Sequence, residues 1–261
     1  MLDRNAILKE MDITQWVERD AAPVAVALEQ KHEQKIESKA VIATPVVKAV
    51  VEAVMPKPEV SILKAVDVHA HEDLSSLAAA VTTCTGCALS KERIQTVFGM
   101  GAEQADWMLV GLAPGSHEEA QGKPIAGRAG QLLTQMLRAL QMQREEVYIS
   151  NALKCKLGKQ GDSLADTLAK TWTACAPILQ KQVALVQPKV MLVLGEKSAQ
   201  ALLNSTESLE NLRGKVYYYG ADKTPLIVTH HPAGILRKPE DKAEVWADLL
   251  LAYQQTAAIK R

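Results

Sequence analysis

After about residue 73 the chain alternates short apolar runs with longer stretches in which apolar positions follow helical spacing. Compact apolar runs with β-branched residues are typical of strands buried on both faces. The alternation predicts an α/β fold, a three-layer αβα sandwich around a central four-stranded, mainly parallel sheet. The expected strands are residues 107–110, 147–150, 190–194 and 226–229, and the expected helices are 130–142, 166–186, 196–203 and 238–256.

Parallel sheets of this kind bind their ligands at the carboxyl ends of the strands. This rule selects three loops as candidate sites: residues 111–115, 151–154 and 230–234. The first reads Gly-Leu-Ala-Pro-Gly, the second begins with Asn151, and the third contains His230 and His231. Of the two adjacent histidines, we expect His230 to be structural or to tune its neighbour.

The N-terminal part of the chain has a different character. Residues 21–72 are rich in Ala, Val, Lys, Glu and Pro, and no aromatic residue occurs between Trp16 and Phe98. Such a stretch has little with which to build a core, and its prolines interrupt helices. We therefore expect a mostly disordered linker at 21–72, between a short peptide at 1–20 and a folded domain at 73–261.

The peptide at 1–20 carries apolar side chains near helical spacing, ending at Ile13 and Trp16. An apolar anchor on a tether suits docking into the groove of a partner protein. The alternative is a helix that packs on its own domain.

Charge and targeting signals add little to this picture. Lys+Arg and Asp+Glu both number 30, but residues 79–261 carry 21 basic and 17 acidic side chains. This slight basic excess is compatible with nucleic-acid binding. We find neither a secretory leader nor the roughly 18 uninterrupted apolar residues of a membrane helix, and expect a cytoplasmic protein without membrane contact.

The chain has four cysteines, at Cys84, Cys87, Cys155 and Cys175. A C-x2-C pair presents two sulfurs from one tight turn, and two distant cysteines can complete a four-thiolate metal site. Reduced thiols of a cytoplasmic protein favour metal ligation over disulfides. Four unrelated thiols are the alternative.

Several motifs in a fixed order accompany these cysteines. Together they resemble the type-4 uracil-DNA glycosylase family, from about residue 74 to the end of the chain. The resemblance implies a DNA repair enzyme that hydrolyses the N-glycosidic bond of uracil in DNA, with a 4Fe-4S cluster on the four cysteines. The motifs are Cys84-Thr-Gly-Cys87, Val97-Phe-Gly99, Gly111-Leu-Ala-Pro-Gly115, Gly122-Lys-Pro-Ile-Ala-Gly127, Asn151, Lys154-Cys155, Cys175, Leu194-Gly195, Arg213-Gly214 and His231-Pro-Ala.

The resemblance also implies roles for single residues. The Asn151 amide suits the O4 and N3–H edge of uracil, because one amide offers both a donor and an acceptor. His231 would donate to O2, where negative charge develops, and backbone groups of Gly111, Leu112 and Ala113 would hold the attacking water. The remaining expected contacts are Glu118 and Ile125 with the substrate, and Leu236 and Arg237 with DNA.

The chain departs from the family pattern at three places. Leu112 replaces a glutamate that positions water, although the string Gly-Leu-Ala-Pro also resembles a motif of type-5 glycosylases, which lack a polar residue there. Ile125 replaces an aromatic residue that stacks on uracil. The Arg-Pro-Pro run of the family is missing after Cys155.

The N-terminal peptide resembles that of the psi subunit of bacterial DNA polymerase III, which binds the chi subunit. The resemblance rests on Met11 to Trp16 and implies that Ile13, Gln15 and Trp16 bind chi. Two hypotheses follow: a glycosylase tethered to the replisome, and a non-catalytic psi-like adaptor of the clamp-loader assembly. Asn151, His231 and the cysteines favour the enzyme, whereas the three departures favour the adaptor.

Overall fold

The computed structural model describes residues 65–158 and 164–258. The expected N-terminal peptide and most of the expected linker lie outside these residues. Val68, which falls in the expected linker, is buried in a small cluster with Leu77, Val81 and Ile178.

The described part of the chain forms one six-stranded sheet in the order β1-β3-β2-β4-β6-β5. The four expected strands make its parallel centre, and each outer strand pairs with its neighbour in antiparallel fashion. The outer strands β1 and β5 are additions to the expected four-stranded sheet. The strands are β1 (Met100–Gly101), β2 (Trp107–Gly111), β3 (Tyr148–Asn151), β4 (Val190–Leu194), β5 (Val216–Tyr219) and β6 (Thr224–Thr229).

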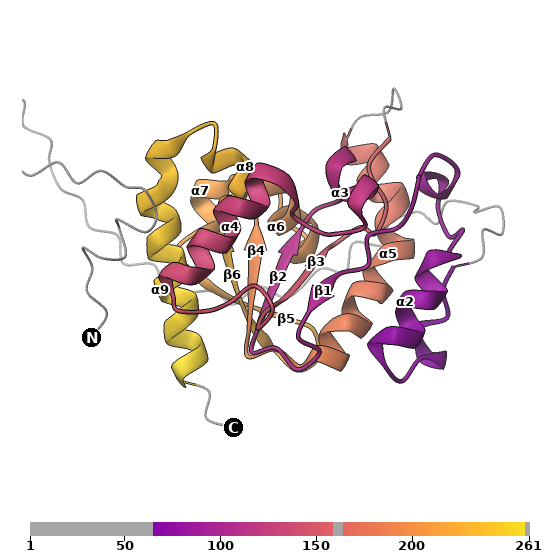
Figure 1. The fold of residues 1–261 in the computed structure, drawn as a ribbon, viewed down its shortest axis with the longest axis horizontal. Helices are drawn as coiled ribbons and strands as arrows, with labels where there is room; N and C mark the ends of the chain where they lie inside the picture. Colours follow the sequence, from indigo (N-terminus) through magenta and orange to yellow (C-terminus); the bar gives the residue numbers. More distant parts are fainter. Residues whose placement is uncertain (1–64, 159–163, 259–261) are drawn as a thin grey trace, which may run out of the picture. The chain divides into compact units, whose positions relative to one another are not determined.

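Helices cover both faces of the sheet, so the three-layer αβα architecture is confirmed (Figure 1). Successive residues of a strand point to opposite faces. Trp107 and Leu109 of β2 therefore join the core under α4 (Gly127–Ala139) and α9 (Lys242–Ala258), whereas Met108 and Val110 join the core on the other face. That second core includes residues of α5 (Leu164–Val186), α6 (Glu196–Leu203) and α7 (Leu209–Leu212).

The remaining helical segments are short. Those before the sheet are η1 (Val68–Ala70), α2 (Leu74–Thr82) and η2 (Ala88–Lys91), and those in the loops are α3 (Ser116–Gln121), α8 (Pro232–Ile235) and η3 (Pro239–Asp241). None of the helices in the described part of the chain has the length and apolar character needed to span a membrane.

Five helix ends differ from the expected ranges, and two of them have clear local causes. Helix α4 stops at Ala139 rather than at 142, and Gln141 just beyond it adopts a left-handed φ of 59°, a conformation that ends helices. Helix α9 starts at Lys242 rather than at 238, because Lys238 is not helical and Pro239 opens the separate turn η3.

Candidate active site and cysteine cavity

The loops that follow β2 and β3 are joined at the carboxyl end of the sheet. The N–H of Ala152 donates to the carbonyl of Gly111, and the N–H of Leu153 donates to the carbonyl of Leu112, each at 2.8 Å. These bonds continue the parallel ladder past the ends of the strands. Gly111, Leu112 and Asn151 therefore lie on neighbouring, mutually fixed segments, as the sequence predicts.

Asn151 is the last residue of β3, and its side chain is only 1% exposed. Its Nδ2 atom has no hydrogen-bond partner among the described residues. A buried donor without a partner costs about 1–3 kcal/mol, so such a group calls for a specific explanation. An amide held in this way is suited to a ligand that supplies the missing acceptor.

Gly111 makes room for that amide. A β-carbon on Gly111 would collide with Oδ1 of Asn151 and would lie 3.9 Å from Nε2 of His231. Asn151 and His231 thus converge on the same glycine, although 80 positions separate them in the chain. The structure brings together the two residues expected to carry the chemistry.

His231 precedes α8, and its Nδ1 accepts a hydrogen bond of 3.1 Å from the N–H of Ala233. A neutral imidazole that accepts at Nδ1 carries its proton on Nε2, the nitrogen nearer to Gly111. Burial, helped by the charge of Arg237, lowers the pKa of His231 to about 4. At neutral pH, His231 is therefore an uncharged hydrogen-bond donor.

Glu118 braces the loops around this site. Its carboxylate accepts hydrogen bonds from the N–H of Gly115 and the N–H of Ile125. Ile125 has a left-handed φ of 48° and is buried in the core under α4. The carboxylate of Glu118 is therefore engaged by the protein's own backbone, and it holds the main chain at Ile125 in a conformation that β-branched residues rarely adopt.

Leu236 and Arg237 follow α8 at the surface. The Leu236 side chain is 39% exposed, and Arg237 is exposed as well. Ala113, by contrast, is half-buried and packs against a buried cluster that contains Leu89, Leu153 and three of the cysteines.

The four cysteines line one cavity, together with Arg93 and Lys154. All four are free thiols, and three of them are buried. Backbone and guanidinium N–H groups approach the sulfurs: Gly86 N donates to Cys84 Sγ, and Arg93 Nη1 donates to Cys155 Sγ, each at 3.4 Å. Such donors stabilise negative charge on sulfur, as in thiolate-ligated metal centres.

Two of these thiols share a hydrogen bond. Donation from the Cys175 thiol holds the pKa of Cys87 below its ordinary value and raises the pKa of Cys175. Burial raises the pKa of Cys155. The lowered pKa of Cys87 favours its thiolate, the form that binds metals.

Comparison with known proteins identifies the family of this domain. The model of the uracil DNA glycosylase superfamily matches residues 98–250. The chain belongs to the uracil DNA glycosylase superfamily. It is 33% identical over 183 residues to the type-4 uracil-DNA glycosylase of Archaeoglobus fulgidus, covering 68% of this chain and 90% of that protein. It is 34% identical over 175 residues to the type-4 uracil-DNA glycosylase of Sulfurisphaera tokodaii, covering 64% and 78% of the two chains.

One feature of this glycosylase-family domain was not assigned a role from the sequence. Lys154 is buried, and its Nζ donates to Ser150 Oγ (2.7 Å), to the Asn151 carbonyl (2.6 Å) and to Gln182 Oε1 (2.6 Å). Burial lowers the pKa of Lys154 to about 7. The available signal was a single lysine in the otherwise uncharged stretch 147–155. Its partner Gln182 comes from α5 and could be identified only in the folded domain.

Proposed function

We propose that this protein removes uracil from DNA by hydrolysing the N-glycosidic bond. The observation that carries the proposal is the buried Nδ2 atom of Asn151, which has no hydrogen-bond partner among the described residues, in a side chain that lies beside Gly111 as Nε2 of His231 does. Membership in the uracil DNA glycosylase superfamily supports it.

The chemistry requires the base to leave the duplex, because a stacked base cannot be reached. Asn151 is suited to accept from N3–H of uracil and to donate to O4, which would satisfy the Nδ2 atom. As the bond from C1′ to N1 breaks, negative charge spreads onto the base. The neutral His231 would donate its Nε2–H to O2 and stabilise that charge without transferring a proton.

Water must then add to C1′ of the sugar. Leu112 has no polar side chain for this task, so we assign the water to main-chain groups of Gly111, Leu112 and Ala113. The sugar cation reacts readily once it forms, so stabilisation of the leaving anion is the larger demand on the enzyme. For the duplex, we assign Leu236 and Arg237 to DNA contact, because an exposed apolar side chain can wedge between bases while a cation meets phosphate.

Uracil release from single-stranded and duplex oligonucleotides tests this function. We expect Asn151→Ala to lower the single-turnover rate about 100-fold or more, by analogy with loss of one oxyanion donor. Asn211→Ala, at an exposed position of α7, is the matched control and should keep the wild-type rate. If the wild-type protein at stoichiometric amounts releases no uracil, the non-catalytic adaptor becomes the better description.

We further propose that the four cysteines hold a 4Fe-4S cluster. Support comes from the cavity that all four cysteines line, and from the N–H groups of Gly86 and Arg93 that donate to Cys84 Sγ and Cys155 Sγ. Four thiolates are the usual ligands of such a cluster, and donors to the sulfurs stabilise its negative charge. Bound here, the cluster would fasten the segment after Asn151 to α5.

Anaerobically purified protein should show absorbance near roughly 400 nm and about four irons per chain. Cys155→Ser should lose both signals. A colourless protein with one tightly held zinc would contradict the cluster and indicate a structural zinc site. Thiolate ligation needs reduced cysteines, and for this reason we propose the cytoplasm as the compartment.

For the N-terminal peptide we propose binding to the chi subunit of DNA polymerase III through Ile13, Gln15 and Trp16. Support comes from the sequence resemblance, since these residues lie outside the described part of the chain. Titration of chi with the full-length protein should show binding that Trp16→Ala or deletion of residues 1–20 abolishes. Unchanged affinity in either variant would refute the tether.

A further inference from the structure

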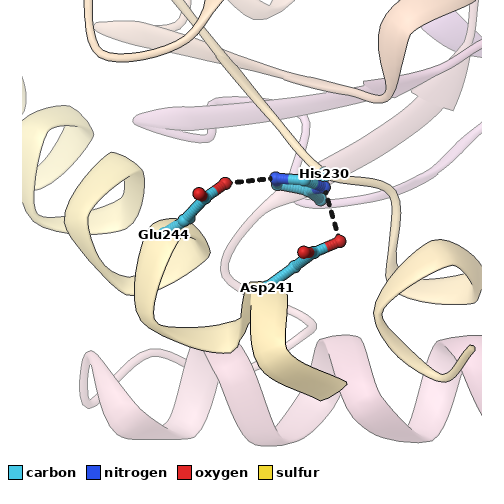
Figure 2. A group of neighbouring side chains, drawn as sticks. All are labelled: His230, Asp241 and Glu244. Carbon is cyan, nitrogen blue, oxygen red and sulfur yellow. Dashed lines mark hydrogen bonds and ion pairs between the residues drawn. The ribbon is translucent and has the colours of Figure 1, made fainter. Parts of the chain in front are cut away.

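The imidazole of His230 lies between two carboxylates (Figure 2). Its Nδ1 is 3.2 Å from Oδ2 of Asp241, and its Nε2 is 2.9 Å from Oε2 of Glu244. The side chains of His230 and Asp241 are 13% and 20% exposed, whereas that of Glu244 is 52% exposed. The contact with Asp241 is therefore the better shielded of the two, and polar contacts shielded from water are stronger than those on an open surface.

The contact with Asp241 closes a loop. His230 follows β6 directly, and Asp241 ends η3, so the two residues are the ends of the segment 230–241. This segment contains His231, α8, Leu236 and Arg237. His231, which is proposed to stabilise the leaving base, therefore lies in the same loop as Leu236 and Arg237, which are proposed to contact DNA. A side-chain contact joins the two ends of this loop.

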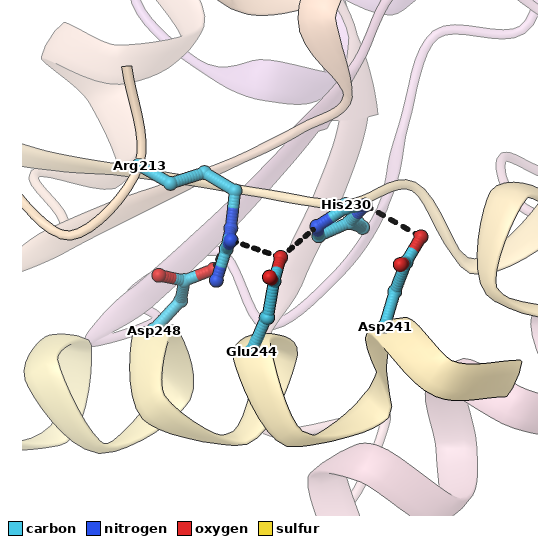
Figure 3. Close-up of polar contacts among 5 residues, drawn as sticks. All are labelled: Arg213, His230, Asp241, Glu244 and Asp248. Carbon is cyan, nitrogen blue, oxygen red and sulfur yellow. Dashed lines mark hydrogen bonds and ion pairs between the residues drawn. The ribbon is translucent and has the colours of Figure 1, made fainter. Parts of the chain in front are cut away.

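A second set of contacts anchors the closed loop to the body of the domain (Figure 3). Glu244 of α9 also forms an ion pair with Nη1 of Arg213, and Nε of Arg213 donates to Oδ2 of Asp248 at 2.7 Å. Asp248 is 1% exposed and belongs to the buried side of α9. The chain of contacts thus runs from the loop through α9 to the segment after α7.

A metal ion does not explain this group of side chains as well. The two carboxylates face opposite nitrogens of the ring, whereas a single ion could be ligated by only one nitrogen. Glu244 is in addition neutralised by Arg213. Hydrogen bonding on both sides of the ring is the simpler interpretation.

We propose that His230 is a positioning residue that clasps the loop 230–241 and thereby holds His231 and Leu236 in place for extracting uracil from duplex DNA. The inference rests on the proposed function and extends it to substrate form. Extraction from a duplex needs a rigid wedge, because unstacking and unpairing cost a few kcal/mol. In a single strand the base is already unpaired, and most of this free energy is not required. Loosening the loop should therefore lower the excision rate less on a single strand.

Single-turnover excision rates on duplex and single-stranded uracil test the clasp. We expect His230→Leu to lower the duplex rate about 10-fold or more and the single-strand rate less than about 3-fold, since small misplacements in a site cost large factors. Asp241→Asn should change the ratio of the two rates in the same direction. It is the substitute variant if His230→Leu does not fold. His230→Gln keeps one donor and should fall between wild type and His230→Leu.

The matched control is Lys189→Met, which removes a 2.9 Å ion pair with Asp106 at the opposite end of the sheet. It should leave the ratio of duplex to single-strand rates at the wild-type value. A ratio that does not change in His230→Leu and Asp241→Asn would overturn the proposal, as would an equal loss on both substrates.

Hydrogen–deuterium exchange of DNA-free protein gives a measurement that does not depend on activity. The amides of Gly234, Leu236 and Arg237 are hydrogen-bonded within the loop and should be protected. Their exchange should accelerate in His230→Leu and Asp241→Asn but not in Lys189→Met. Unchanged exchange would overturn the clasp. A wild-type protein that releases no uracil would refute the glycosylase proposal, while the exchange result would still decide the clasp.

Discussion

Gly111 shows how much one residue determines at this site. It ends β2, accepts the hydrogen bond that fixes the loop after β3, and has no side chain where Asn151 and His231 converge. Its φ is not in the left-handed region, so backbone freedom is not what requires glycine here. The requirement is space for the Asn151 amide.

We therefore expect Gly111→Ala to displace Asn151 and to lower the rate of uracil release about 100-fold, since sub-ångström to ångström shifts have effects of this size. The control is Gly220→Ala in the turn before β6, where a β-carbon meets no atom within 4 Å. It should cost about 1–2 kcal/mol of stability through its left-handed φ of 70° and leave the rate unchanged. Wild-type activity in Gly111→Ala would show that Asn151 is not held as described.

At the scale of elements, strand β3, helix α5 and the cysteine cavity are joined by one buried polar network. Gln182 of α5 accepts from Lys154 and Ser150, and its Nε2 donates to the Phe98 carbonyl at 2.9 Å and to the Tyr148 hydroxyl at 3.1 Å. Because Lys154 also lines the cysteine cavity, the strand end that carries Asn151 and the cavity wall are parts of one unit.

Lys154→Met tests this unit through two opposing effects. The variant removes the cost of burying an ammonium group, but it also removes the hydrogen bonds that Lys154 donates to the Asn151 carbonyl, Ser150 Oγ and Gln182 Oε1. We expect a net loss of about 1–2 kcal/mol in urea unfolding and about a 10-fold slower release of uracil. Lys197→Met, at a half-exposed position, should stay within about 0.5 kcal/mol of wild type. If Lys154→Met released uracil at the wild-type rate, the polar network would have no effect on the Asn151 site.

At the scale of the whole molecule, the half-buried His231 links stability to pH. Its pKa in the folded protein is about 4, below the ordinary value of about 6.5. As the pH falls below about 6.5, the unfolded chain takes up a proton at His231, whereas the folded chain does not until about pH 4. Stability present above pH 6.5 is therefore lost progressively as the pH falls toward 4.

Between about pH 7 and 5, wild type should lose about 1–2 kcal/mol more free energy of unfolding than His231→Asn. Urea unfolding at a series of pH values measures the difference. Asn211→Ala, at an exposed position and without a titratable group, should retain the pH dependence of wild type. Parallel curves for wild type and His231→Asn would contradict a half-buried, neutral His231.

Much of the fold could be predicted because its central elements are local in character. The runs 190–194 and 196–203 have the expected bounds, since each is a compact apolar strand or an amphipathic helix bounded by turn residues. The outer strands β1 and β5 were missed because a two-residue strand and a half-exposed Val-Tyr-Tyr-Tyr run have no distinctive pattern. Such strands exist through pairing with β3 and β6, which is a long-range property.

The sequence alone predicted the parallel centre of the sheet and the three loops at its carboxyl end, and it indicated Asn151, His231 and the four cysteines as candidate site residues. These follow from local patterns and from motifs that resemble a known family. Only the tertiary structure decided that Asn151 and His231 meet at Gly111, that Lys154 is buried beneath Asn151, and that His230 joins Asp241 and Glu244. The physical reason is that these contacts join segments far apart in the chain, so their distances are set by sheet order and helix packing, which no single segment encodes.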